Sequence, residues 1–570
     1  MTRLSRRDLL KRVGAAGAGA LAAPGLAGQA QTTSLRISGR PVEIVITPVS
    51  AVTTRISVLP LAEDPTSDRA TARALRGDGA LIDRQWPPPA ARLTSLQEQG
   101  SVPSGTLTLV LPARAARDDG KTAFAIRVQA SDSRPSFTLR ADAVTGTLAF
   151  SLGGGAILGL GEGGPQFDRR GSTDRMRSGQ GGYQLRTHGG RVPVQWMIGT
   201  SGWSMFIHRP SGTFDFTGPE ARFDPGAPAD VLPIDFFVVG AREPSAMMAE
   251  YAALTGLPAL PPMWALGYQQ SHRTLASREE VLEEARTFRE RKLPCETLIY
   301  LGTGFCPSGW NTDNGEFTFN PKVFTDPKAI IDDLHAEHFK VVLHIVLEGR
   351  TLRGTVADGC SSPPLPGGKR PDGTWPDDRQ VACYWPVHKP LFDLGVDGWW
   401  PDQGDGLDAS SRLARNRMYW DGARAWRPNE RPFALHRNGH AGMQRYGAFL
   451  WSGDVFSTWE TLATHVPVAV NTGLSGIPYW GTDVGGFVPT KEFTGELYVR
   501  WFQFGAFCPL FRAHGRTWKL RLPWGWNTGG LEPDEVLATT AGAANPDASE
   551  LHNAAVEPVC RKYLELRSRL

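Results

Sequence analysis

The sequence changes its rhythm near residues 258–262, and this change constrains the fold more than any other feature. Before it, short apolar runs such as 42–47 and 234–239 are broken by Gly, Pro, Asp and Ser roughly every ten residues. Short strands at this spacing are typical of a β-sandwich. The sequence therefore predicts an N-terminal β-sandwich.

Beyond residue 262, strand-like and helical patterns alternate. Strand-like runs occur at 265–269, 298–301 and 340–346, and amphipathic stretches occur between them at 277–292 and 326–337. Ser277 is a candidate N-cap of the first helix. Alternation at this interval predicts parallel βα units, and enough chain follows for a (β/α)₈ TIM barrel. The expected fold class is therefore α/β, with a (β/α)₈ TIM barrel preceded by a β-sandwich.

The first thirty residues carry the pattern of an export signal. A basic start that includes Arg6-Arg7 is followed by an Ala/Gly-rich apolar stretch at 13–23 and by a small-x-Ala cleavage site at 28–30. Residues 5–11, Ser-Arg-Arg-Asp-Leu-Leu-Lys, resemble the twin-arginine motif. We therefore expect a bacterial, periplasmic protein. We divide the chain into a twin-arginine signal peptide at 1–30, a β-sandwich domain at 31–258 and a barrel domain at 259–570, whose last helix lies near the chain end.

Composition limits the partners that such a chain can have. Sixty-one Lys and Arg against 58 Asp and Glu give a net charge of +3, which excludes nucleic-acid binding driven by overall charge. Eighteen Trp offer aromatic faces for sugar rings, although Trp is also a core residue. After the signal, no stretch reaches the roughly 18 apolar residues of a membrane span. The six cysteines show no paired CxxC spacing, and no metal or other cofactor is expected.

Two acidic segments lie where barrel strands are expected to end. Residues 398–405 read Gly-Trp-Trp-Pro-Asp-Gln-Gly-Asp, and residues 449–454 read Phe-Leu-Trp-Ser-Gly-Asp. Loops at these strand ends carry the active sites of TIM barrels. Cleavage of a glycosidic bond uses two carboxyl groups, one to attack or to activate water and one to protonate the leaving oxygen. Asp402 and Asp454 are the candidates, although a single Asp at a strand end also commonly caps a loop or pairs with Arg.

Longer motifs around these residues carry a resemblance to a known family. Trp400-Pro401-Asp402 matches a Trp-x-Asp nucleophile motif, and Arg437 followed by 441–446 and 451–454 matches an acid/base segment. Residues 476–487 and 500–514 extend the match. On these motifs the chain resembles glycoside hydrolase family 31, the retaining α-glycosidases that include α-glucosidases and α-xylosidases.

The resemblance implies a role for each matched residue. It implies that Asp402 is the nucleophile and that Asp454 is the general acid/base. The sugar in the first subsite would be bound by Arg437, Asp483 and His514, and walled by Trp400 and Trp451. Without the resemblance, the first three would be interpreted as an ion pair, a strand-end cap and a core histidine, and both Trp would suit the barrel core equally well.

The resemblance also implies an activity, although the sequence departs from the family's usual pattern at Gly302 and at its C-terminal end. The implied activity is that of a retaining exo-α-glycoside hydrolase acting on α-linked oligosaccharides by double displacement, of α-glucosidase or α-xylosidase type. The family usually ends its second barrel strand with an Asp, but Gly302 stands there. The family's C-terminal β-domains are expected to be absent, because no matching segment occurs by Leu570.

Two alternatives stay open. The same site would also serve a transglycosylase or an α-glucan lyase, because the acceptor decides the outcome. A glycan-binding protein without turnover is favoured by Gly302 and by the expected absence of the C-terminal β-domains, while the presence of both Asp402 and Asp454 argues against it. A carbohydrate is the expected partner under each reading, and the sequence does not indicate an oligomeric state.

Overall fold

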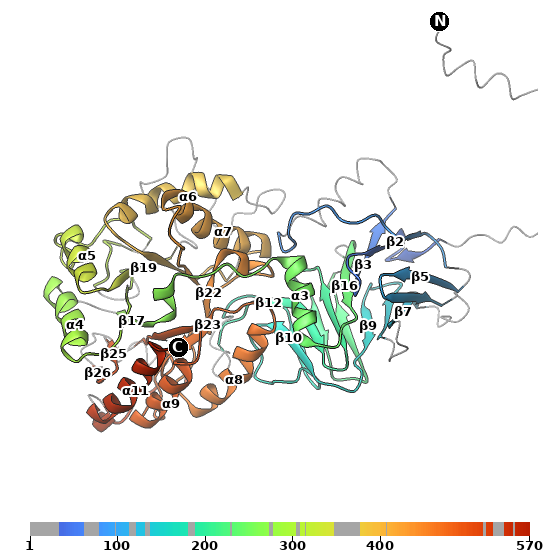
Figure 1. Cartoon of the computed structure of the whole chain (residues 1–570). Helices are drawn as coiled ribbons and strands as arrows, with labels where there is room; N and C mark the ends of the chain where they lie inside the picture. The colour runs from blue at the N-terminus through green and yellow to red at the C-terminus, as the bar shows by residue number, and fades with distance from the viewer. Residues whose placement is uncertain are drawn as a thin grey trace, which may run out of the picture.

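The computed structural model describes most of the chain, and Figure 1 shows how its helices and strands are arranged. The described residues are 34–61, 79–96, 99–112, 121–130, 137–180, 189–227, 231–272, 277–303, 308–313, 315–346, 377–405, 407–516, 520–527, 541–550 and 553–570. The predicted signal peptide lies outside them.

The N-terminal region consists of two antiparallel sheets. The first contains, in spatial order, β1 (Arg36–Ile37), β2 (Arg40–Pro48), β3 (Thr53–Pro60), β16 (Ile234–Val239), β13 (Trp203–Ile207), β12 (Pro193–Gly199) and β10 (Ile157–Gly161), with β4 (Ala91–Leu93) paired to β2. The second contains β11 (Thr173–Arg175), β14 (Thr213–Asp215), β15 (Glu220–Asp224), β9 (Leu148–Ser151), β8 (Phe137–Asp142), β7 (Thr122–Ala130), β6 (Leu107–Leu111) and β5 (Gly100–Ser104). The strand-rich character expected for this region is confirmed.

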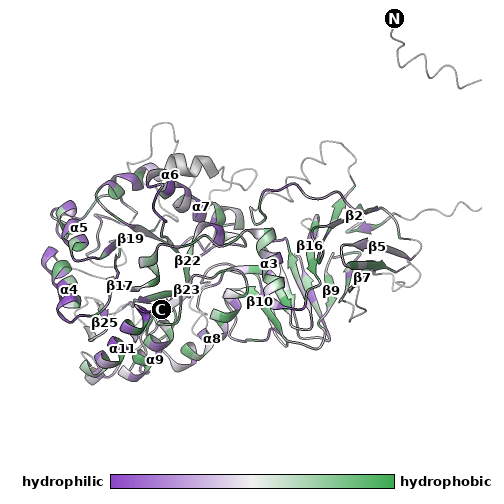
Figure 2. Cartoon of the chain, viewed as in Figure 1, coloured by the Kyte–Doolittle hydropathy of each residue, from purple (hydrophilic) through white to green (hydrophobic). Residues whose placement is uncertain are grey.

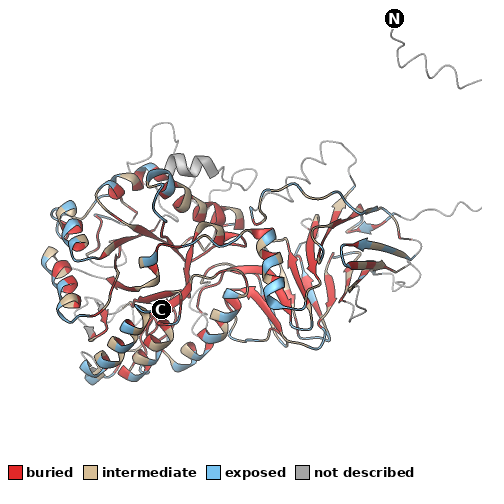
Figure 3. Cartoon of the chain, in the orientation of Figure 1, coloured by how far each residue is buried: buried red, intermediate tan, exposed pale blue. Residues whose placement is uncertain are grey.

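The two sheets share one hydrophobic core. Along β6 the side chains of Leu107, Leu109 and Leu111 are buried and those between them are half-buried, which is the two-residue period of a strand with one face inward. These leucines join Ile44 of β2 and Met205 of β13 in a single cluster. Figures 2 and 3 show the result, since the strands of this region are largely hydrophobic and buried.

The C-terminal region is a barrel of eight parallel strands. Their spatial order is β20 (Gly398–Asp402), β19 (Lys340–Val346), β18 (Thr297–Tyr300), β17 (Tyr268–His272), β24 (Leu510–Ala513), β23 (Trp480–Asp483), β22 (Phe449–Trp451) and β21 (Leu435–His436). A parallel bridge between Trp399 and Ala434 joins β20 to β21 and closes the ring. The predicted TIM barrel is therefore confirmed.

Helices surround the barrel (Figure 1). They are α4 (Arg278–Glu290), α5 (Pro327–Ala336), α6 (Asp377–Asp393), α7 (Ala409–Trp426), α8 (Trp459–Gly473), α9 (Gly495–Gly505) and α11 (Glu557–Arg567), while α3 (Pro244–Thr255) precedes the barrel. Ser277 caps α4 as predicted, because its side chain accepts a hydrogen bond from the Glu280 amide. Among the described residues, no helix has the length and apolar character needed to cross a bilayer.

The first barrel strand starts later than the sequence predicted. Residues 265 and 266 belong to the 3₁₀ turn η4 (Met263–Leu266), and β17 begins at Tyr268. Gly267 ends the turn in extended backbone, so the chain enters the sheet only where Tyr268 pairs with Phe511 of β24. The strand prediction at 265–269 was therefore three residues early.

The N-terminal region packs on the barrel through β10 and α8. The amide of Gly159 donates to Asn471 Oδ1 at 2.7 Å, and the amide of Gly161 donates to Ser475 Oγ at 2.7 Å. Gly159 has a φ of +97°, and a Cβ there would lie 2.6 Å from the Trp196 carbonyl oxygen. Glycine is therefore required where β10 meets α8. The boundary between residues 258 and 259 stays a prediction.

Candidate active site

The last five barrel strands bring the predicted site residues to one end of the barrel. Asp402 and Asp483 are the last residues of β20 and β23, Arg437 and His514 directly follow β21 and β24, and Asp454 lies three residues after β22. Because the carboxyl ends of parallel strands meet at the same rim, five separate motifs converge there.

Donors surround the carboxylate of Asp402, a residue that is only 6% exposed. The Gln403 amide donates to Oδ1 at 2.7 Å, Arg437 Nη1 lies 3.4 Å from Oδ1, and His344 Nε2 lies 3.2 Å from Oδ2. Burial by itself would raise the pKa of Asp402, but the Arg437 charge and the His344 hydrogen bond hold that pKa well below its ordinary value. The carboxyl group therefore stays ionised.

The turn after Asp402 holds this arrangement. Gln403 has a φ of +58°, in the left-handed region that residues other than glycine rarely adopt. Its carbonyl oxygen accepts hydrogen bonds from Arg415, at 3.0 Å, and from Asn438. These contacts stabilise the turn that aims the Gln403 amide at the carboxylate.

Arg437 links Asp402, at the end of β20, to Asp405, three residues later. Its Nε and Nη2 each lie 3.1 Å from an oxygen of Asp405, in a bidentate pair. Burial alone would lower the pKa of Arg437, but the carboxylates of Asp402, Asp405 and Asp454 raise it above its usual value. Arg437 is therefore a fixed positive charge between Asp402 and Asp405.

Asp454 has the opposite protonation tendency. Burial and the nearby negative charge of Asp402 raise its pKa, although Arg437 acts against them. The N-terminal region holds this residue in place, because Gln180 Nε2 donates to Asp454 Oδ2 at 3.1 Å and Gln180 Oε1 accepts from the Asp454 amide. Asp402 and Asp454 therefore form a pair of carboxyl groups whose pKa values are displaced in opposite directions.

Asp483 lies deeper, in an ion pair with Arg512. Both side chains are fully buried. Burial raises the pKa of Asp483 to about 7 in spite of the Arg512 charge. Asp483 Oδ2 accepts no hydrogen bond within the described part of the chain.

The two predicted wall residues, Trp400 and Trp451, lie in the barrel interior. They are 2% and 1% exposed, their ring centroids are 5.2 Å apart at right angles, and Arg512 Cζ lies 4.2 Å from the Trp400 centroid. The His514 ring lies perpendicular to Trp400, with centroids 5.0 Å apart, and stacks on Phe487, with centroids 5.4 Å apart. The Trp400 ring thus packs against His344, His514 and Arg512 in the barrel interior, and contact of either Trp with a sugar stays a prediction.

Two contacts at this site were not predicted from the sequence. His344 lies inside β19, a strand that was predicted correctly. Successive side chains of a strand point to opposite faces, and this alternation was the signal that could have placed His344 inside the barrel. Gln180 comes from the N-terminal region, and nothing in its local sequence indicates a contact 274 residues away. Glu162, also in the N-terminal region, contacts the barrel by accepting a 2.7 Å hydrogen bond from Trp480 Nε1.

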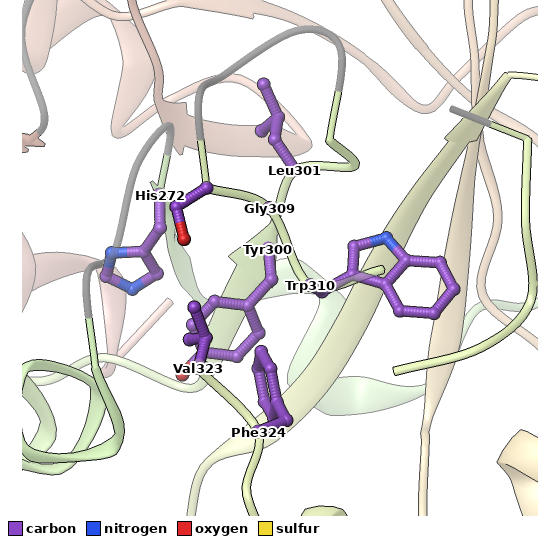
Figure 4. Close-up of a pocket in the computed structure, with 8 residues that line it drawn as sticks. His272, Tyr300, Leu301, Gly309, Trp310, Val323 and Phe324 are labelled. Carbon is purple, nitrogen blue, oxygen red and sulfur yellow. The ribbon is translucent and has the colours of Figure 1, made fainter. Parts of the chain in front are cut away.

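A separate cavity lies beside β17 and β18 (Figure 4). Its lining includes His272, Tyr300, Trp310, Val323 and Phe324, and it has room for about one water molecule. This cavity is too small for a sugar ring, and the cluster around Asp402 is the candidate active site.

The barrel thus holds two carboxyl groups beside an arginine, one with a lowered pKa and one with a raised pKa. Glycoside hydrolases use such a pair of carboxyl groups. Residues 258–570 match the model of the glycosyl hydrolases family 31 TIM-barrel domain. The chain belongs to glycoside hydrolase family 31, a family of glycosyl hydrolases, as the motifs indicated.

Similar proteins include two glycosidases. The chain is 31% identical over 322 residues to an α-xylosidase of Saccharolobus solfataricus, covering 51% of this chain and 42% of that protein. It is 32% identical over 332 residues to α-glucosidase 2 of Bacillus thermoamyloliquefaciens, covering 49% of this chain and 40% of that protein. The matched part is thus about two fifths of the length of these relatives.

Solved structures share the fold. A family 31 α-xylosidase from a soil metagenome, complexed with xylose, has a TM-score of 0.68 at 20% identity and covers 94% of this chain and 83% of its own. A family 31 dextranase of Flavobacterium johnsoniae, complexed with glucose, has a TM-score of 0.69 at 21% identity and covers 92% of this chain and 66% of its own. Both likenesses extend beyond the barrel into the N-terminal region.

Proposed function

We propose that the protein is a retaining exo-α-glycoside hydrolase that acts on α-linked oligosaccharides, of α-glucosidase or α-xylosidase type. One observation carries the proposal: Asp402 is held ionised, while burial and the charge of Asp402 favour the protonated form of Asp454. A nucleophile and a general acid need these two states at the same time. The names of the similar α-xylosidase and α-glucosidase support the choice of sugar classes.

The reaction has two steps. An oxygen of Asp402 attacks the anomeric carbon, the bond to the leaving oxygen breaks with its electron pair on that oxygen, and Asp454 gives the oxygen a proton. The product is a β-glycosyl ester. The Asp454 carboxylate then takes a proton from water as the water oxygen attacks the anomeric carbon and displaces Asp402. Two inversions retain the α configuration.

The remaining predicted residues have binding roles in this proposal. Arg437 stabilises the ionised Asp402, and Arg437, Asp483 and His514 provide donors and acceptors for sugar hydroxyls. Gly302 places no acid where the family usually has one, so either another residue binds the sugar hydroxyls far from the cleaved bond, or the preferred sugar differs. A panel of aryl α-glucosides, α-xylosides and α-galactosides, followed by NMR, tests the activity and names the sugar; binding without turnover across the panel contradicts it.

The pH dependence of kcat/KM should have an alkaline limb set by Asp454. Asp402 is ionised far into the acidic range, so kcat/KM falls when Asp454 loses its proton as the pH rises. For a substrate with a poor leaving group, we expect this fall to be absent in Asp454→Ala, measured over the same pH range. An alkaline limb of unchanged position and depth in the variant contradicts the assignment of Asp454 as the acid.

We also propose that the twin-arginine segment exports the protein to the periplasm. Replacing both residues of the pair, Arg6→Lys with Arg7→Lys, should leave the protein in the cytoplasm, because the pair is the recognised feature of the signal. The matched control, Arg3→Lys with Arg12→Lys, keeps the pair and should be exported. Cell fractionation measures both, and unimpaired export of the first variant contradicts the proposal.

A further inference from the structure

A buried histidine faces the carboxylate of Asp402 from the neighbouring strand. In the parallel pairing of β19 with β20, His344 lies opposite Trp400 and Val346 lies opposite Asp402. Alternate residues point to the same face, and Val342 and Trp400 belong to the core inside the barrel. His344 therefore points into the barrel, where its Nε2 lies 3.2 Å from Asp402 Oδ2.

The second ring nitrogen fixes the proton of this histidine. The backbone amide of Gly302 donates to His344 Nδ1 at 3.3 Å. Since Nδ1 accepts this hydrogen bond, the neutral ring carries its proton on Nε2. The Nε2–H group then donates a hydrogen bond to the ionised Asp402 carboxylate. The ring is held edge-on to Trp400, with centroids 4.6 Å apart, and the His344 carbonyl oxygen accepts a 2.7 Å hydrogen bond from Trp310 Nε1.

We propose that His344 is a positioning residue for the nucleophile, and this role rests on the proposed function. The Gln403 amide and Arg437 contact Oδ1 of Asp402, whereas His344 contacts Oδ2. Donors on both oxygens stop the carboxylate from rotating, so that one oxygen stays aimed at the anomeric carbon. The same hydrogen bond stabilises the negative charge that returns to Asp402 when the ester is cleaved.

Gly302 and His344 act as a pair in this arrangement. A Cβ at residue 302 would lie 3.4 Å from the His344 carbonyl oxygen and 3.3 Å from Asn311 Oδ1, a closer approach than most Cβ atoms make. Glycine avoids this crowding at the position whose amide donates to the ring. The residue that departs from the family pattern is the one that orients the histidine.

The test compares His344→Phe, which keeps a ring without a donor, with His344→Gln, which keeps an amide donor. For an activated aryl α-glycoside, we expect His344→Phe to lower kcat about 10- to 100-fold, as for a lost hydrogen bond to a charged group, with little change in KM. The acidic limb of kcat/KM should move to higher pH, because the pKa of Asp402 rises without the donor. His344→Gln should restore part of both.

The matched control is His388→Phe. His388 is also buried, and it bonds the Tyr419 hydroxyl at 3.0 Å among the helices outside the barrel strands. This variant should lose stability and leave the acidic limb in place. An unchanged kcat and acidic limb in His344→Phe overturns the positioning role while the proposed function stands. Absence of turnover by the wild-type protein overturns both.

A folding defect is distinguished by a second donor-free variant. If His344→Phe does not fold, His344→Met takes its place, with circular dichroism and thermal unfolding measured first. If His344→Met folds, the same changes in kcat and in the acidic limb are expected. Failure of both donor-free variants to fold shows that His344 is required for folding and contradicts a role confined to positioning.

Discussion

Asp402→Ala is expected to lower kcat by about 10⁴-fold or more, whatever the leaving group, because loss of a nucleophile removes the covalent step. Steady-state kinetics with an aryl series of different leaving-group basicity measures this. Asp393→Ala removes an exposed carboxylate that pairs with Lys389 on α6 and should leave kcat unchanged.

Added azide distinguishes a nucleophile from other essential residues. In Asp402→Ala, azide enters the space of the missing carboxylate and attacks the α-glycoside directly, so a single displacement gives the β-glycosyl azide. NMR identifies the anomer. An α-glycosyl azide from this variant would mean that Asp402 and Asp454 have exchanged roles, and undiminished turnover would place the site elsewhere.

Asp454→Ala should show a loss that depends on the leaving group. For poor leaving groups we expect about 10²- to 10⁴-fold, the usual contribution of general acid–base catalysis, because the departing oxygen needs a proton. An activated aryl glycoside needs little protonation, so its first step should largely survive. Its glycosyl ester should then accumulate, because the base that activates water is missing.

Azide should rescue the second step of this variant. It is an anionic nucleophile that needs no base, and its attack on the β-glycosyl ester gives the α-glycosyl azide after two inversions. Rapid-mix kinetics of the aryl burst and NMR of the product measure both effects. Equal losses across the whole aryl series, with no burst and no rescue, would contradict the acid/base role.

The barrel was predictable because its pattern is local. The strand predicted at 340–346 coincides with β19, and Ser277 caps α4 as expected, since apolar alternation and capping are written in neighbouring residues. The convergence of Asp402, Arg437 and Asp454 follows from the same reasoning, because each comes at or just after the carboxyl end of a parallel strand.

Other features depend on contacts that are distant in sequence. The start of β17 at Tyr268 is set by pairing with β24, about 240 residues later, and not by the local run at 265–269. Gln180 reaches Asp454 from the N-terminal region. The opposed pKa values of Asp402 and Asp454 result from burial and from distances to Arg437, which only the folded chain defines.

The most direct test of the central claim is to trap the glycosyl-enzyme. A 5-fluoro α-glycosyl fluoride of the preferred sugar has a good leaving group, which favours the first step, and a ring fluorine, which slows both steps by destabilising the oxocarbenium-like transition state. Peptide mass spectrometry of the treated protein should show one glycosyl unit on Asp402. A label on another carboxylate, or turnover of α-glycosides without any covalent label, would contradict the proposed double displacement at Asp402.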